Sequence, residues 1–164
     1  MTLSTADLHH LRAAEGWLGL GDFQSAHDEL ENITPILRAH PAVLQIRHGI
    51  FSEAEKWEHA LTIAEALVNL LPDDPYGWIH RSFALHELKR TAEAQEELRP
   101  AAETFPKEHV VFYNLACYAC QLGNLKEALR LLGKAIDLAG KRDIRLMALD
   151  DPDLEPLWKD IGEI

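Results

Sequence analysis

Residues 75–108 read PYGWIHRSFALHELKRTAEAQEELRPAAETFPKE, and their pattern is the clearest indication of the fold. Its first half has a helical spacing, because Trp78, Ser82 and Leu85 fall at i, i+4 and i+7. A short polar break follows at residues 89–91, and a second helical stripe comes after it. The proline that opens the stretch suits a helix start, where its missing N–H costs nothing. The stretch therefore predicts a helix, a tight turn and a second helix.

The same pattern returns every 34 residues along most of the chain. One column holds an alanine in all four copies: Ala26, Ala60, Ala94 and Ala128. Three residues before each alanine lies a large or branched side chain: Phe23, Trp57, Thr91 and Leu125. Columns that stay in step over four copies indicate an internal repeat, which fixes the fold class more firmly than any single segment.

These columns resemble the tetratricopeptide repeat, whose pattern W-x2-L-G-x2-Y…A-x3-F…P has a period of 34 residues. The third copy places these residues in its columns: Trp78, Arg81, Ser82, Leu85, Ala94, Leu98 and Pro106. The resemblance covers residues 7–140 and implies an all-α solenoid of helix-turn-helix repeats. We expect four tetratricopeptide repeats, at about 7–40, 41–74, 75–108 and 109–140. We also expect a capping helical segment at 141–164, with residues 1–164 forming a single domain.

Glycines and prolines predict where helices turn and end. Gly21 and Gly123 lie at turns, where a residue that tolerates positive φ is needed. Pro35 and Pro100 lie within the predicted second helices, so we expect a kink or an early end there. In the cap, Asp151 is a good N-cap residue, with a proline at the first helical position and apolar residues turned inward. These inward residues are Leu154, Leu157, Trp158 and Ile161.

Composition narrows the class of partner. The 164 residues include 27 acidic and 16 basic side chains, a net charge of −11, which disfavours a nucleic-acid partner. Two cysteines are too few for a disulfide framework. We see neither a signal peptide nor an apolar run long enough to span a membrane. The sequence predicts a cytoplasmic protein that does not bind membranes.

The resemblance implies that the first helix of each repeat lines a concave groove. The stripe of Tyr76, Ile79, Phe83 and His86 continues in the fourth copy as Val110, Tyr113, Cys117 and Cys120, and it is mostly uncharged. A solvated face would be charged, so the stripe indicates either a binding groove or packing against neighbouring helices. We assign the peptide-binding groove to Gln45, Tyr76, His80, Phe83, Tyr113, Asn114 and Cys117. Because Glu15, Glu53 and Glu87 lie in groove columns and Arg12 is the one cation there, we expect neutral, aromatic or basic ligands.

The resemblance also suggests a role for Asn114, because related proteins use an asparagine there to hydrogen-bond a peptide backbone. An amide offers both donor and acceptor. A solvent-facing Asn114 without such a role is the alternative, since the same column holds Arg12 and Ile46 in the first two copies.

Catalytic motifs are weak. Cys117 and Cys120 form a C-x-x-C, but no strand precedes it, and with His86 it gives a metal site only three ligands. We predict no enzyme activity, no cofactor and no metal, and a non-catalytic scaffold or adaptor that binds a protein or peptide. Alternatives are a secretion-type chaperone for an apolar client, a thiol or metal enzyme, and a homo-oligomer.

Overall fold

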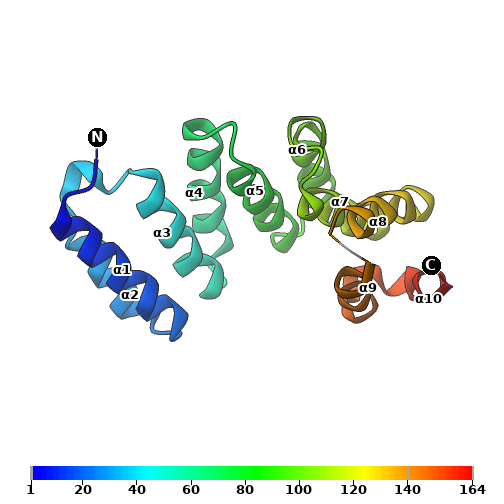
Figure 1. The fold of residues 1–164 in the computed structure, drawn as a ribbon, viewed down its shortest axis with the longest axis horizontal. Helices are drawn as coiled ribbons and strands as arrows, with labels where there is room; N and C mark the ends of the chain where they lie inside the picture. The colour runs from blue at the N-terminus through cyan, green and yellow to red at the C-terminus, as the bar shows by residue number, and fades with distance from the viewer. Residues whose placement is uncertain (1, 140, 164) are drawn as a thin grey trace. The chain divides into compact units, whose positions relative to one another are not determined.

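The computed structural model describes residues 2–139 and 141–163, which form ten α-helices and two 3-10 helices and include no strand (Figure 1). The four predicted helix pairs are α1 (Thr5–Gly19) and α2 (Phe23–Glu31), α3 (Pro41–Glu53) and α4 (Trp57–Leu70), α5 (Pro75–Glu87) and α6 (Thr91–Thr104), and α7 (His109–Gln121) and α8 (Leu125–Ala139). The 3-10 helix η1 is Pro35–Leu37, and the C-terminal elements are α9 (Lys141–Asp150), η2 (Pro152–Leu157) and α10 (Trp158–Glu163). The predicted all-α repeat fold is thus confirmed. Met1, Gly140 and Ile164, where we placed the start of the domain and the ends of the fourth repeat and the cap, lie outside the described residues.

Each turn between paired helices contains one residue in the left-handed region. Gly21 has φ +78° and Gly123 has φ +81°, as predicted. Glu55, at φ +53°, and Lys89, at φ +64°, occupy the corresponding positions in the second and third pairs. The four positions are 34 residues apart, so the repeat sets the turn conformation even where the residue is not glycine.

The two prolines predicted to disturb second helices behave differently. The helix α2 ends at Glu31, and Pro35 begins the separate 3-10 helix η1, so the early end is confirmed there. Pro100 lies inside α6, which continues to Thr104. An early end at Pro100 was therefore wrong.

The chain divides into two compact units, residues 1–77 and 78–164, with the boundary inside α5. The single-domain organisation stays a prediction. The core of the first unit lies between α1, α2, η1 and α3, and its buried members are Ala14, Ala26, Leu30, Ile33, Leu37, Val43 and Ile50. Its first helix begins with a capping box, in which Ser4 accepts from the Asp7 backbone and Asp7 accepts from Ser4.

The second unit centres on α7, which is buried along almost its whole length. The helix packs against α6 and α8, and η2 packs against it as well. A helix covered around its circumference belongs to a core, not to a solvent-lined groove. The cap residues that were predicted to turn inward are also covered. Leu154, Leu157 and Ile161 are fully buried, and Trp158 is half-buried.

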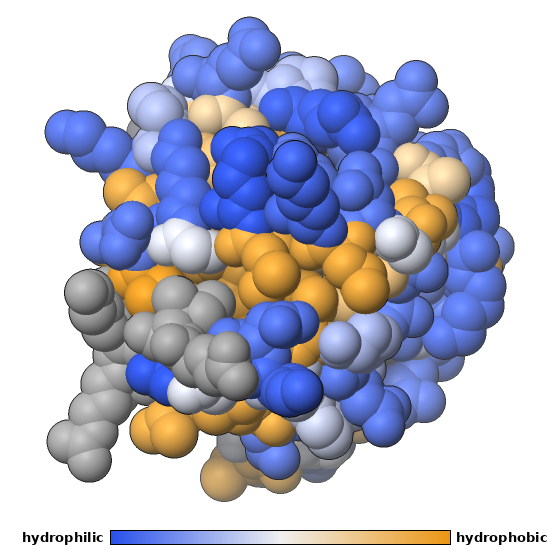
Figure 2. All heavy atoms as spheres, turned by 90° about the vertical axis from the view of Figure 1, so that its right-hand side faces the viewer, coloured by the Kyte–Doolittle hydropathy of each residue, from blue (hydrophilic) through white to orange (hydrophobic). Residues whose placement is uncertain are grey.

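The outer surface of the cap is not uniformly polar. Figure 2 shows apolar surface bordered by hydrophilic residues at the C-terminal end of the second unit. In α8 and α9, Leu138, Leu146 and Met147 are exposed. Among the described residues, no helix combines the length and the apolar character that crossing a membrane requires.

Candidate binding surface on helix α7

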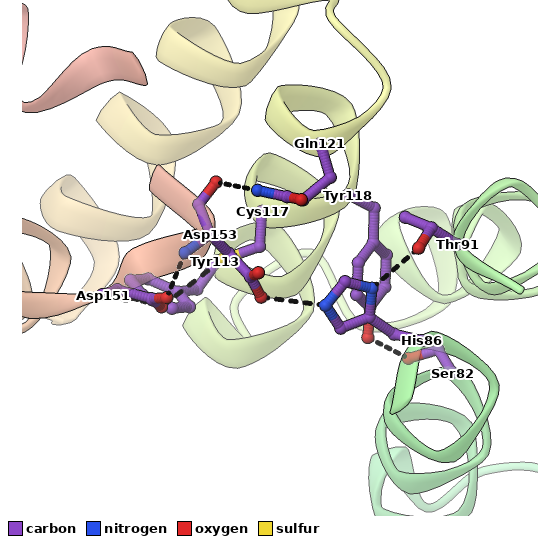
Figure 3. A network of polar contacts seen from close by, with 9 residues as sticks. All are labelled: Ser82, His86, Thr91, Tyr113, Cys117, Tyr118, Gln121, Asp151 and Asp153. Atoms are coloured by element: carbon purple, nitrogen blue, oxygen red, sulfur yellow. Dashed lines mark hydrogen bonds and ion pairs between the residues drawn. The ribbon is translucent and has the colours of Figure 1, made fainter. Parts of the chain in front are cut away.

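One face of α7 presents hydrogen-bond donors at successive turns. Tyr113, Cys117 and Gln121 are four residues apart, so their side chains lie along one side of the helix. Tyr113 is 6% exposed and Cys117 is 5% exposed, so both side chains are covered and do not face solvent. The cover is the chain's own C-terminal segment (Figure 3).

The covering segment is η2 together with its N-cap residue, and it makes several polar contacts with α7. The Tyr113 hydroxyl donates to Oδ2 of Asp151 over 2.7 Å, and the Cys117 thiol lies 3.7 Å from the same oxygen. The amide of Gln121 donates to the backbone carbonyl of Asp153 over 2.8 Å. The other oxygen of Asp151 accepts from the Asp153 N–H, which confirms the predicted N-cap.

A histidine at the end of α5 completes the contact. Nε2 of His86 lies 2.9 Å from Oδ2 of Asp153, and Nδ1 lies 2.9 Å from the Thr91 hydroxyl. Because an ionised carboxylate only accepts, Nε2 carries the proton that joins it to Asp153. The imidazole also lies against the Tyr118 ring, with centroids 5.1 Å apart, and the Tyr118 hydroxyl lies 3.1 Å from that of Ser82. These contacts fix the position of the imidazole.

The surroundings of α7 raise the pKa of two of its side chains, Tyr113 and Cys117. Burial raises the pKa of the Tyr113 hydroxyl, and its hydrogen bond to Asp151 raises it further. Burial also raises the pKa of the Cys117 thiol, with added effects from the charges of Asp151 and Asp153. A reactive cysteine needs a lowered pKa, so this environment disfavours thiol catalysis.

The side chains that could bind a metal here are not the three that the sequence suggested, which were Cys117, Cys120 and His86. Cys117, Asp151 and Asp153 each offer a ligand atom, all within 4.8 Å of one another. Both oxygens of Asp151 and Oδ2 of Asp153 already accept hydrogen bonds. Cys120, one of the three ligands considered, is a separate buried free thiol. The contacts are those of a docked segment, and they leave its carboxylates with partners.

The other predicted groove residues divide between the two units. In the first unit the Tyr76 hydroxyl lies 3.4 Å from the carbonyl of Gln45 and 3.3 Å from Nδ1 of the buried His48. Burial and the Asp74 charge raise the pKa of Tyr76 to about 12. In the second unit, burial lowers the pKa of His80.

Phe83 and Asn114 complete the second unit's share of the predicted groove. Phe83 is 39% exposed, and Asn114 is half-buried. In the second unit, Tyr113 and Cys117 lie together beneath Asp151 of the C-terminal segment. A single groove formed by all seven residues stays a prediction.

Sequence reasoning missed three residues of this surface. We assigned Asp151 a cap role only, and we assigned no role to Asp153 or Gln121. Gln121 lies one turn after Cys117 in the same stripe, which is a signal that could have identified it. The docking of Asp153 beside His86, 67 residues earlier, has no local signal.

Helix pairs with a left-handed turn residue every 34 positions define an α-helical repeat protein. The chain has the tetratricopeptide-repeat fold, since solved proteins of that class superpose on most of it. TTC0263, a thermophilic TPR protein of Thermus thermophilus, matches with a TM-score of 0.74 and 20% identity, over 96% of this chain and 84% of that chain. YrrB, a TPR protein with an unusual peptide-binding site, matches with a TM-score of 0.71 and 21% identity, over 89% and 75%. The first TPR of Spaghetti (RPAP3), bound to the HSP90 peptide SRMEEVD, matches with a TM-score of 0.61 and 15% identity, over 75% and 90%.

No protein-family model matches the chain, and no curated protein matches it. At these identities the likeness is one of fold.

Proposed function

We propose that this protein is a non-catalytic interaction module that binds a peptide or protein segment on the inner faces of its first helices. The observation that supports the proposal most directly is the segment seated on α7. Tyr113 and Gln121 hold the N-terminal part of the 3-10 helix η2 there by hydrogen bonds, one of them to a backbone carbonyl. A surface that binds such a segment in cis has the chemistry needed to bind one in trans.

Related structures support the same function. YrrB has a peptide-binding site, and the RPAP3 domain was solved with a bound peptide. The raised pKa of Cys117 argues for a role without catalysis. The two buried free thiols suit a reducing compartment, so a cytoplasmic location is part of the proposal. The charge of −11 favours a protein partner over a nucleic acid.

Phe83 offers the sharpest test of the inner face. It precedes His86 by three residues, so both lie on one side of α5, and its ring is 39% exposed. Truncating an exposed aromatic anchor at an interface costs binding without opening a core cavity. We expect Phe83→Ala to reduce capture of the partner from a lysate of the native host at least tenfold.

The matched control is Leu125→Ala, because Leu125 is also 39% exposed but lies on the second helix α8. Capture is quantified by mass spectrometry, with far-UV circular dichroism to verify helicity. Equal capture by wild type and Phe83→Ala, or an equal loss with Leu125→Ala, would contradict binding on the inner face. Light scattering of the purified chain tests whether the partner is a second copy.

A further inference from the structure

The surface that faces the C-terminal segment is made of hydrogen-bond donors, and none of them belongs to a lysine or an arginine. It consists of the Tyr113 hydroxyl, the Cys117 thiol, the Gln121 amide and the imidazole N–H of His86. Facing them are two carboxylates and one carbonyl (Figure 3). Several donors from two helices that converge on acceptors are complementary to an acidic chain segment.

We propose that this surface recognises an acidic segment of the Asp-x-Asp-Leu type, that residues 151–157 occupy it in the free protein, and that a partner segment of the same chemistry displaces them. The inference rests on the proposed function and specifies its ligand. It differs from the ligand class expected from Glu15, Glu53 and Glu87, because the second unit supplies phenol, thiol, amide and imidazole donors where lysine and arginine are absent.

A purely structural cap does not need these carboxylates. Leu154, Leu157 and Ile161 are fully buried and provide the apolar cover that a terminal repeat requires. Bringing Asp151 and Asp153 against α7 costs desolvation, which their hydrogen bonds offset. The polar contacts therefore add to the hold on the segment and specify what lies on the surface, beyond the cover that the apolar residues provide.

The segment is held in the manner of a bound peptide. Prolines at 152 and 156 remove two backbone donors, and the segment forms a 3-10 helix, whose hydrogen-bond geometry is poorer than that of an α-helix. Gln121 contacts its backbone carbonyl, which is the contact we had expected Asn114 to make with a peptide. Besides its contacts with α7 and His86, η2 packs against α8, α9 and α10, so its neighbours hold it in place.

Displacement of the segment has a built-in reporter. The thiol of Cys117 is shielded beneath Asp151, and Cys120 is the other cysteine of the chain. In a Cys120→Ala background, the rate at which Ellman's reagent modifies Cys117 measures how often the segment leaves α7.

The test weakens the contacts that hold residues 151–157 on α7 but keeps an N-cap residue for η2. Asp151→Asn with Asp153→Asn keeps a good N-cap residue but replaces charge-assisted hydrogen bonds by neutral ones, which are about half as strong. We expect the Cys117 modification rate to rise about tenfold. The control is Asp150→Asn, which removes a neighbouring exposed carboxylate and leaves the rate unchanged. Circular dichroism verifies that each full-length variant is folded.

The binding probe is a fluorescein-labelled peptide of sequence DDPDLEPLW, residues 150–158, followed by anisotropy. A tethered competitor has an effective concentration in the millimolar range, so the wild type binds this probe weakly. We expect the double variant to bind it at least tenfold more tightly. Two changes should each abolish this tighter binding. One adds Tyr113→Phe to the double variant, and the other replaces the probe's aspartates at positions 151 and 153 by asparagine.

Three results would overturn the inference. The first is an unchanged Cys117 rate in the double variant, because the carboxylates then do not hold the segment. The second is a faster rate without probe binding, which makes the segment a cap and nothing more. The third is binding that ignores both Tyr113→Phe and the substituted probe. If probe binding succeeds while host capture by the Phe83 face fails, the proposed function falls and the acidic-segment surface stands.

Discussion

Replacing glycine by alanine at three helical positions should give three different outcomes, and the sign at each position follows from the space around the missing Cβ. At Gly77 a Cβ would lie 2.7 Å from the backbone nitrogen of Val68 and 3.0 Å from the backbone carbon of Leu67. At Gly49 it would lie 2.8 Å from a terminal carbon of Leu18. At Gly133, in α8, it would meet nothing within 4 Å.

The magnitudes follow from what has to move. The Gly77 contact is about 0.7 Å shorter than the roughly 3.4 Å of ordinary contact, and the obstacle is the backbone of α4, so α4 and the start of α5 must separate. Overpacking of this kind costs about 1–3 kcal/mol, and we expect a loss near 2 kcal/mol for Gly77→Ala. Gly133→Ala creates no close contact and lowers the backbone entropy of the unfolded chain. We therefore expect the free energy of unfolding to rise by about 0.5–1 kcal/mol.

Urea unfolding followed at 222 nm measures both changes. With a slope of about 2 kcal/mol per molar urea, the midpoint falls by about 1 M for Gly77→Ala and rises by about 0.4 M for Gly133→Ala. Gly49→Ala is the matched control in the first unit, because the end of the Leu18 side chain can rotate away and leave the midpoint nearly unchanged. A wild-type midpoint for Gly77→Ala, or a lowered midpoint for Gly133→Ala, would show that the space around the missing Cβ does not set these changes.

Two further predictions concern the turns and one cap. Glu55→Gly and Lys89→Gly should each raise the Tm by a few degrees, because left-handed φ costs an L-residue about 1–2 kcal/mol and costs glycine almost nothing; Gly123→Ala should lower it. Differential scanning calorimetry measures these shifts, and one direction for all three would be contrary to the turn geometry. Hydrogen bonds from the Ser4 side chain and the Thr34 backbone hold the pKa of Asp7 well below its usual 3.8. This stabilisation is complete above about pH 4 and is lost as the pH falls toward the lower pKa of the folded state. The Tm difference between wild type and Asp7→Asn should therefore shrink from pH 6 to pH 3, and a constant difference would argue against an ionised cap.

Local periodicity explains why so much of the fold was predictable. The spacing of apolar residues predicts each helix pair. The column that holds Gly21 and Gly123 also fixes the turn conformation of Glu55 and Lys89. Pro100 shows that a local rule does not decide where a helix ends, because α6 continues past it to Thr104 despite the missing N–H.

The candidate site was predictable only in part, for a related reason. The helical period correctly places Tyr113 and Cys117 on one face of α7. It contains no information about what covers that face, because the contacts between Tyr113 and Asp151 and between His86 and Asp153 join residues 38 and 67 positions apart. An apolar stripe at helical spacing fits a solvent-lined groove and a covered helix equally well.

The charge pattern of the sequence does not indicate the contact between carboxylates and α7. A carboxylate ligand was expected to need cations, and the groove columns hold almost none. The structure instead brings Asp151 and Asp153 against a phenol, an amide and an imidazole. Arginines at those positions would form charge-assisted, bidentate bonds, and a tethered segment held so firmly would exclude any partner. A phenol, an amide and an imidazole recognise the same carboxylates at lower cost of release, so their weaker hold is the property that lets this surface exchange its own segment for another.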